Sequence, residues 1–229
     1  MVQAIFFDFN GVIIDDEPLQ LQAYQKVLGS QGIELTREEY YASMGMDDKA
    51  FVIAAYQRAS RELSSEALLQ TIEGKSQIHR QLIEHSLPLF PGVVTFLKTT
   101  ARRYQIGLVS MARRVEIDYV LERAELASLF SVIVSAEKVR NHKPDSECYV
   151  QALAKLNQIR ASDRLLPLAA RECLVIEDAT QGIQAASVPG MRTIGVTNSV
   201  SESALRAAGA EIVTRSLADW TVEAVDLLF

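Results

Sequence analysis

The chain has 229 residues, of which 48% are hydrophobic and 23% charged, as is typical of a globular protein with one large domain or one domain carrying an insertion. Its net charge of -6 argues against a nucleic-acid-binding protein, because such proteins normally present a basic face. Two cysteines, Cys148 and Cys173, provide neither a disulfide framework nor a metal-binding spacing. The first apolar run is interrupted by Asp8 and is too short to cross a bilayer. We therefore expect a cytoplasmic protein without membrane or nucleic-acid partners.

The first predicted element is a buried strand at the N-terminus. An apolar and aromatic run begins at Ala4 and ends on Asp8, and Gly11 then allows a sharp turn. A carboxylate at the end of an apolar strand is costly unless a cation meets it. Asp8 is therefore the first candidate for a functional residue.

A helical block follows the first strand, and no strand is predicted before residue 88. Asp15, Asp16, Glu17 and Pro18 resemble the start of a helix, with acids near the positive end of the helix dipole. Three further helices are predicted from capping residues: Thr36 with Glu39, Asp47 or Asp48, and Ser64 or Ser65. Residues 44–46 are interpreted as a break between two of these helices.

Strands and helices alternate in the rest of the chain. Strands are predicted at 105–110, 131–134, 173–176, 193–196 and 211–213, and helices at 91–97, 112–124, 144–157 and 180–187. This alternation indicates βαβ units and a parallel sheet covered on both faces. In such sheets a ligand binds outside the carboxyl ends of the strands. Ser110 and the pair Glu177 and Asp178 follow two of these strands, so we expect them to meet Asp8.

The predicted fold is α/β. Residues 1–14 and 89–229 are expected to form a Rossmann-like, doubly wound parallel sheet with flanking helices. Residues 15–88 are expected to form an inserted all-helical cap domain over the ligand crevice.

Four motifs in this order resemble the haloacid dehalogenase superfamily. They are DFNGV at 8–12, LVS at 108–110, NHKPD at 141–145 and VIEDATQGIQAA at 175–186. The resemblance covers nearly the whole chain and is closest to the branch with β-phosphoglucomutase and phosphoglycolate phosphatase. It implies a Mg²⁺-dependent phosphatase that acts on a small phosphorylated metabolite, such as a sugar phosphate or a phosphoglycolate-like compound. We expect such an enzyme to be a monomer or weak dimer.

The resemblance also assigns a nucleophile and a metal site. Asp8 is expected to attack phosphorus and form an aspartyl-phosphate. Asp8, Asp178 and the backbone carbonyl of Asn10 are expected to hold Mg²⁺, with Glu177 as a further ligand or as a support for the ligands. Alternatively, Glu177 and Asp178 could simply cap the helix that begins at Thr180.

Further residues are expected to bind the phosphate or the substrate. Lys143 is expected to hold the phosphate and the nucleophile together, and Ser110 to donate to a phosphate oxygen. The plain alternatives are a solvated lysine and a serine that caps the next helix. Additional substrate contacts are expected from residues that lie close to these motifs or in the cap: Gly11, Met111, Arg113, Glu17 and Lys49. Three histidines, His79, His85 and His142, show no metal-binding spacing and are expected at the surface.

Asn10 departs from the family pattern. Phosphatases and mutases of this family have an aspartate there, which exchanges protons with the leaving oxygen and with water, and an amide cannot do so. Four interpretations remain: substrates with good leaving groups, a substitute carboxylate such as Asp16 or Glu17, a variant made to trap an intermediate, or a nearly inactive phosphometabolite-binding protein. Haloalkanoate dehalogenases also lack this aspartate, but they do not need magnesium, so the retained acidic pair favours phosphoryl transfer.

A sugar-phosphate mutase resembling β-phosphoglucomutase is the alternative enzyme. Such mutases use an arginine in the cap to hold the distal phosphate, whereas this chain reads MGMDDK around Gly45. Lys49 is close to that position but displaced from it. The sequence therefore favours the phosphatase over the mutase.

Overall fold

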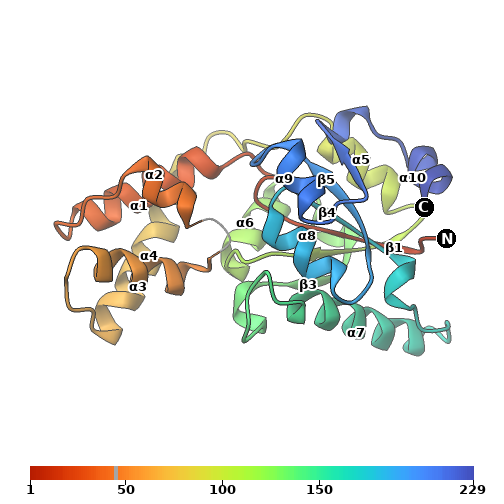
Figure 1. Ribbon diagram of the computed structural model, residues 1–229, viewed down its shortest axis with the longest axis horizontal. Helices are drawn as coiled ribbons and strands as arrows, with labels where there is room; N and C mark the ends of the chain where they lie inside the picture. Colours follow the sequence, from red (N-terminus) through yellow and green to blue (C-terminus); the bar gives the residue numbers. More distant parts are fainter. Residues whose placement is uncertain (44–45) are drawn as a thin grey trace.

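The computed structural model describes residues 1–43 and 46–229, and within them six parallel strands form one sheet in the order β3-β2-β1-β4-β5-β6 (Figure 1). The strands are β1 Ala4–Phe7, β2 Gln105–Val109, β3 Phe130–Val134, β4 Cys173–Glu177, β5 Arg192–Val196 and β6 Ile212–Thr214. The order reverses between β1 and β4, which is where doubly wound sheets form their ligand crevice. The predicted α/β fold class is confirmed.

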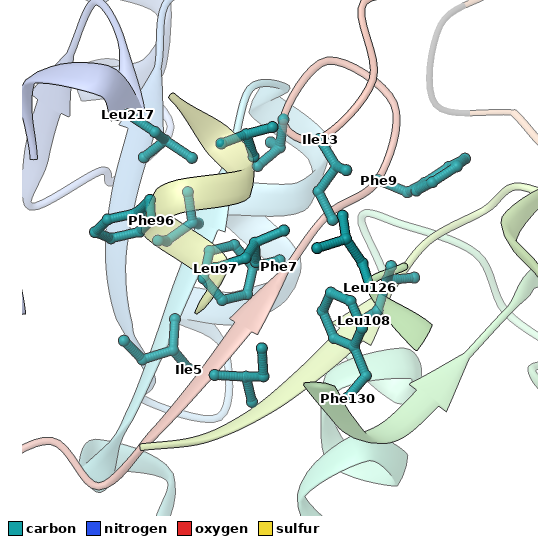
Figure 2. Packing of buried hydrophobic residues seen from close by; sticks show 14 of the residues in the cluster. Ile5, Phe7, Phe9, Ile13, Phe96, Leu97, Leu108, Leu126, Phe130 and Leu217 are labelled. Carbon is teal, nitrogen blue, oxygen red and sulfur yellow. The ribbon is translucent and has the colours of Figure 1, made fainter. Parts of the chain in front are cut away.

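Successive side chains of β1 point to opposite faces of the sheet and so belong to two different cores. Ile5 and Phe7 pack in a cluster with α5 Val93–Thr100, α6 Arg114–Arg123 and α10 Val222–Leu228 (Figure 2). Ala4 and Phe6 pack on the other face, against α7 Glu147–Ser162 and α8 Thr180–Ser187. Because both faces are covered, the central strands are nearly continuous apolar runs, interrupted only at their ends by Gln105 of β2 and Glu177 of β4. The remaining elements are α9 Glu202–Ala207 and the 3-10 helices Ala127–Leu129, Ala136–Lys138, Ala170–Glu172 and Leu217–Asp219.

The register of the sheet brings the strand ends together. Phe7 of β1 is paired with Leu108 of β2 on one side and with Ile176 of β4 on the other. The next residue, Asp8, donates its backbone N–H to the carbonyl of Ile176 at 3.0 Å. Glu177 ends β4 and Ser110 directly follows β2 at the same edge, so polar side chains from three segments converge there.

The helical block lies to one side of the sheet (Figure 1) and has its own hydrophobic cluster, which includes Tyr24, Tyr40 and Phe51. Its helices are α1 Glu17–Gly29, α2 Arg37–Ala42, α3 Asp48–Arg58 and α4 Ser65–Leu82. The capping predictions are confirmed, because Thr36 and Glu39 form a capping box and the side chains of Asp47 and Ser64 accept backbone N–H groups. Of the predicted break at 44–46, residues 44 and 45 lie outside the described residues.

The two connections between the helical block and the sheet run side by side. The backbone N–H of Asp15 donates to the carbonyl of Pro88 at 2.7 Å, and Phe90 donates to Ile13 at 3.1 Å. Ile14 and Leu89 form an antiparallel bridge between these contacts. The chain therefore leaves the core and returns to it at one place. The predicted domain limits, 1–14 with 89–229 and 15–88, stay a prediction.

Several element limits differ from the sequence-based expectation. Helix α7 begins at Glu147 rather than at Pro144, because the Glu147 carboxylate accepts the backbone N–H groups of Arg140 and Asn141 and holds the preceding loop. Helix α6 begins at Arg114 rather than at residue 112. Among the described residues, no helix is both long enough and apolar enough to cross a membrane.

Candidate active site

A lysine bridges two carboxylates at the carboxyl edge of the sheet. Lys143 Nζ donates to Asp8 Oδ1 at 2.7 Å and to Glu177 Oε1 at 2.5 Å, and also to the carbonyl of Val109 at 3.0 Å. All three charged side chains are buried. These hydrogen bonds connect the ends of the first and fourth strands with the loop before α7. The alternative that Lys143 is a solvated surface lysine is therefore wrong.

Glu177 is fully occupied by donors from the protein. Besides Lys143, Oε1 accepts the hydroxyl of Tyr149 at 2.9 Å, and Oε2 accepts the backbone N–H groups of Asp178 at 3.2 Å and Ala179 at 3.4 Å. A carboxylate offers about four acceptor positions. Glu177 is therefore suited to position Lys143 and the start of the following loop.

Two glycines make room for the acidic residues. Gly11 has a φ of 77°, and a Cβ atom there would lie 1.8 Å from Asp178 Oδ2. At Gly182, in the first turn of α8, a Cβ atom would lie 1.9 Å from the carboxyl carbon of Glu177. Only glycine fits at Gly11 and Gly182, because the carboxylates of Asp178 and Glu177 lie too close to leave room for a side chain. At Gly11 the left-handed backbone conformation also favours glycine.

Replacing Gly182 by alanine is expected to lower the free energy of unfolding by about 1–3 kcal/mol, although alanine normally stabilises a helix relative to glycine. The new methyl group displaces the Glu177 carboxylate, whose four donors hold it in place. Thermal and urea unfolding measure the change. Gly29→Ala in α1 is the matched control, because a Cβ atom there meets nothing within 4 Å. A stabilised Gly182→Ala variant would contradict the steric argument.

The acidic groups fit a divalent cation. Asp8, Glu177 and Asp178 each offer a carboxylate oxygen, and these atoms lie within 4.8 Å of one another. Burial and the charge of Glu177 raise the pKa of the Asp8 carboxyl to about 7, although Lys143 opposes this. Burial and the charges of Glu177 and Asp8 also raise the pKa of Asp178 well above its usual range, so the negative charges crowd one another. Hard oxygen donors that repel one another suit a hard divalent cation.

Asn10 belongs to a second polar cluster, which is centred on Asp16. Its Nδ2 donates to Asp16 Oδ1 at 2.9 Å, and Gln20 Nε2 donates to Asp16 Oδ2 at 2.9 Å. His79 Nε2 lies 2.8 Å from the same Oδ2 atom, and His79 is only 2% exposed. The prediction of a surface position for His79 is wrong, because the polar face of α4 turns inward. His85 is exposed as predicted, whereas His142 is half-buried, 3.6 Å from Asp47.

A cavity of about 130 Å³ lies between the sheet edge and the helical block. Among the predicted site residues, those that line it are Asp8, Asn10, Glu17, Ser110, Met111, Lys143, Glu177 and Asp178. The carboxylate of Glu17 accepts the Tyr40 hydroxyl at 2.6 Å, and burial raises its pKa although that hydrogen bond opposes the shift. Asp16 does not line the cavity. Of the two carboxylates proposed to substitute for the missing aspartate, only Glu17 therefore faces it.

Three predicted substrate contacts do not line the cavity: Gly11, which is buried, Lys49 and Arg113. Lys49 is exposed, and Arg113 is held by Glu73 Oε2 at 3.3 Å and by Ser76 Oγ at 3.0 Å. Ser110 is at the cavity, and its hydroxyl accepts the backbone N–H of Ala112 at 3.0 Å rather than capping α6. Its own proton is therefore free to be donated to a ligand.

Sequence reasoning missed the polar residues with which the helices line the cavity. They include Gln20 and Tyr24 of α1, Asp48 of α3, Lys75 of α4 and Glu116 of α6. The signal for Lys75 is its helical spacing: Thr71, Lys75, Ser76 and His79 form one face of α4, and all four are buried. The apolar residues of this helix do not form its buried face, and Leu69 is 68% exposed.

Comparisons with known proteins point to one family of hydrolases. A family model described as "Haloacid dehalogenase-like hydrolase" matches residues 5–196. A "Phosphorylated carbohydrates phosphatase" from Thermotoga maritima is 29% identical over 91% of this chain and 92% of its own length, and "Hexitol phosphatase B" from Escherichia coli is 28% identical over 99% and 97%. A crystal structure of β-phosphoglucomutase from Clostridium difficile shares the fold, with a TM-score of 0.83 and 24% identity over 99% of this chain and 96% of that one.

Proposed function

Because the chain belongs to the haloacid dehalogenase-like hydrolase family, which confirms the sequence-based resemblance and makes it a hydrolase, we propose that it is a Mg²⁺-dependent phosphatase of a small phosphorylated metabolite. The observation that carries the proposal is the contact of Lys143 with both Asp8 and Glu177 beside Asp178, at the wall of a cavity. A buried carboxylate, a lysine ammonium group and two further acids line the same cavity, which supports a nucleophile and a phosphate site there.

In the proposed reaction Asp8 is the nucleophile. Lys143 holds Oδ1 and leaves Oδ2 to attack phosphorus, and the bond between phosphorus and the ester oxygen breaks. The alcohol leaves with a proton, and Asp8 carries the phosphoryl group. Water then attacks the same phosphorus, which releases phosphate and restores the carboxylate. Lys143 and the hydroxyl of Ser110 would stabilise the phosphoryl oxygens throughout.

Asp8, Asp178 and the backbone carbonyl of Asn10 would hold the metal, with Glu177 supporting them. Bound Mg²⁺ would offset the repulsion between the attacking carboxylate and the phosphate oxygens. Asp178 is well placed for this role because the hydroxyl of Ser199 fixes its Oδ2 atom and Gly11 leaves space beside it.

Proton transfer to the leaving oxygen is the weak point of the proposed reaction. The side chain of Asn10 cannot exchange a proton. Glu17 is the one of the two proposed substitutes that lines the cavity, and burial raises its pKa, which favours a protonated form that can donate. The proposed enzyme therefore releases good leaving groups readily and poor ones slowly.

Phosphate release is expected to depend on Mg²⁺. The wild-type chain, treated with EDTA and then supplied with Mg²⁺, is assayed with an aryl phosphate, sugar and polyol monophosphates, and phosphoglycolate. Mg²⁺ at 100 times its dissociation constant also stabilises the folded chain by about 2.7 kcal/mol, which thermal unfolding detects without turnover. Asp178→Asn should weaken both effects, whereas the exposed residue Asp163, at the end of α7, provides the matched control Asp163→Asn.

The same assay separates the alternatives. Equal rates and equal unfolding temperatures with Mg²⁺ and with EDTA would contradict the proposal. Stabilisation by a metabolite without phosphate release would identify a binding protein, and activation by a hexose bisphosphate would identify a mutase. The cytoplasmic location and the monomeric or weakly dimeric state stay predictions.

A further inference from the structure

The wall of the cavity that faces the sheet edge is polar and carries more negative than positive charge. We call it the distal wall and define it by Gln20, Tyr24, Asp48, Lys75 and Glu116, which come from α1, α3, α4 and α6. Six carboxylates and two lysines line the cavity as a whole, and no arginine does so among the described residues. Since Lys143 is bound to Asp8 and Glu177, Lys75 is the remaining cation of the described lining that could receive a second anionic group.

Lys75 is already neutralised by two carboxylates. Its Nζ atom lies 3.0 Å from Asp48 Oδ1 and 3.1 Å from Glu116 Oε1, and its side chain is only 3% exposed. The Ser76 hydroxyl donates to Glu116 at 2.6 Å, and the Tyr24 hydroxyl donates to Asp48 at 2.5 Å, so both carboxylates are fixed beside the lysine. A second anion entering here would face two carboxylates and one cation.

The distal wall also contains hydrogen-bond acceptors without donors. Gln20 Oε1 and Asp48 Oδ2 are buried and have no partner among the described residues. A buried acceptor that lacks a donor is costly, and a ligand hydroxyl removes this cost by donating its proton. Phosphate and carboxylate oxygens are acceptors only, so they cannot do the same. The unpartnered atoms therefore favour a ligand with O–H groups.

We propose that Asp48 and Glu116 are specificity-determining residues that neutralise Lys75, so that the distal wall binds the hydroxyl groups of a polyol or sugar monophosphate and excludes a second anion. This inference rests on the proposed phosphatase function and assigns its substrate class. It disfavours phosphoglycolate, whose carboxylate would face the distal wall, and hexose bisphosphates, which a mutase would need. Asp48 and Glu116 would select the substrate by cancelling the positive charge of Lys75, because both carboxylates contact its ammonium group directly.

The test compares two ligands that differ only in the second anion. Isothermal titration calorimetry in Mg²⁺ measures the dissociation constants of a hexitol 6-phosphonate and of the matching 1,6-bisphosphonate, whose C–P bonds resist hydrolysis. The wild-type chain should bind the monophosphonate about tenfold more tightly or better. Glu116→Gln should reduce this preference by about tenfold or reverse it, because Lys75 then keeps one carboxylate partner. Adding Lys75→Gln to Glu116→Gln should restore the preference.

Glu73→Gln is the matched control. Glu73 is on the same helix as Lys75 and the substitution removes the same charge, but the side chain is 59% exposed, pairs with Arg113 and does not line the cavity. It should leave the ratio of the two dissociation constants unchanged. Asp48→Asn is the second variant, in case Glu116→Gln unfolds, and it should change the ratio in the same direction.

Two results would overturn the proposal: a wild-type chain that binds the bisphosphonate as tightly as the monophosphonate, or equal changes in Glu116→Gln and Glu73→Gln. Failure of the proposed function has a different signature. A chain that keeps the affinity ratio but releases no phosphate from an aryl phosphate in Mg²⁺ would contradict the phosphatase function while supporting the ligand class.

Discussion

Asp8→Asn is expected to lower Mg²⁺-dependent phosphate release by roughly 10⁴-fold or more, because the amide oxygen cannot serve as the nucleophile. The substitution is isosteric. In the wild type Lys143 Nζ lies 2.7 Å from Asp8 Oδ1, and it can still donate to the amide oxygen of the variant. Steady-state kinetics with an aryl phosphate measure the loss. Intact-mass spectrometry of the wild-type chain during turnover should show one added phosphoryl group, and the variant should show none.

Loss of folding would be a trivial cause of inactivity, and the structure predicts that it does not occur. Asp8→Asn removes one of three crowded, buried carboxylates, so we expect the variant to unfold in metal-free buffer at the same temperature as the wild type or higher. Asp163→Asn, at the exposed end of α7, should keep full activity. A folded Asp8→Asn protein with wild-type turnover would refute the role of Asp8.

Asn10→Asp is expected to raise turnover of alkyl phosphates by roughly 10²–10⁴-fold, which is the usual value of general acid–base catalysis. A carboxyl group at position 10 would face Asp16, whose Oδ1 atom now accepts the amide N–H at 2.9 Å. Two adjacent carboxylates favour a state in which the pair retains one proton, and from position 10, which lines the cavity, that proton can reach the leaving oxygen. The readout is kcat for a polyol monophosphate.

The leaving group distinguishes this effect from a general improvement of the site. An aryl phosphate has a good leaving group and needs little proton transfer, so its turnover should change far less than that of the alkyl phosphate. Asn10→Ala, which removes the amide without adding an acid, should bring no gain. An equal gain on both substrates, or no gain on either, would show that proton transfer at position 10 does not limit the reaction.

The sheet could be predicted because its local signals agree with its tertiary environment. Strands that are buried on both faces are continuous apolar runs, and the predicted strand at 173–176 corresponds to β4 Cys173–Glu177. The convergence of Asp8, Ser110 and Glu177 then follows from parallel strands alone. The first apolar run predicted the end of its strand less well. Phe9 and Val12 are also buried, but β1 ends at Phe7 because the chain turns at Gly11.

The distal wall of the cavity could not be predicted in the same way. Lys75 forms ion pairs with Glu116 and Asp48, which lie 41 and 27 positions away in the sequence. A local sequence pattern cannot predict a pairing over such a separation. The same applies to His79, whose neighbour Asp16 comes from the connection before α1. A buried polar face on α4 contradicts the usual rule of an apolar inner face, and it exists because that face meets a ligand cavity and charged partners.

The adjoining connections at 13–15 and 88–90 have a consequence for how such enzymes diversify. A segment whose two ends meet can be exchanged for one of another length or shape without stretching the strands that carry it. Asp48 and Lys75 belong to that segment, whereas Asp8, Lys143 and Asp178 belong to the part of the chain that forms the sheet. Exchanging this segment, whose limits are the predicted 15–88, would thus change the part of the cavity wall that carries Asp48 and Lys75, whereas Glu116 of α6 would remain with the sheet.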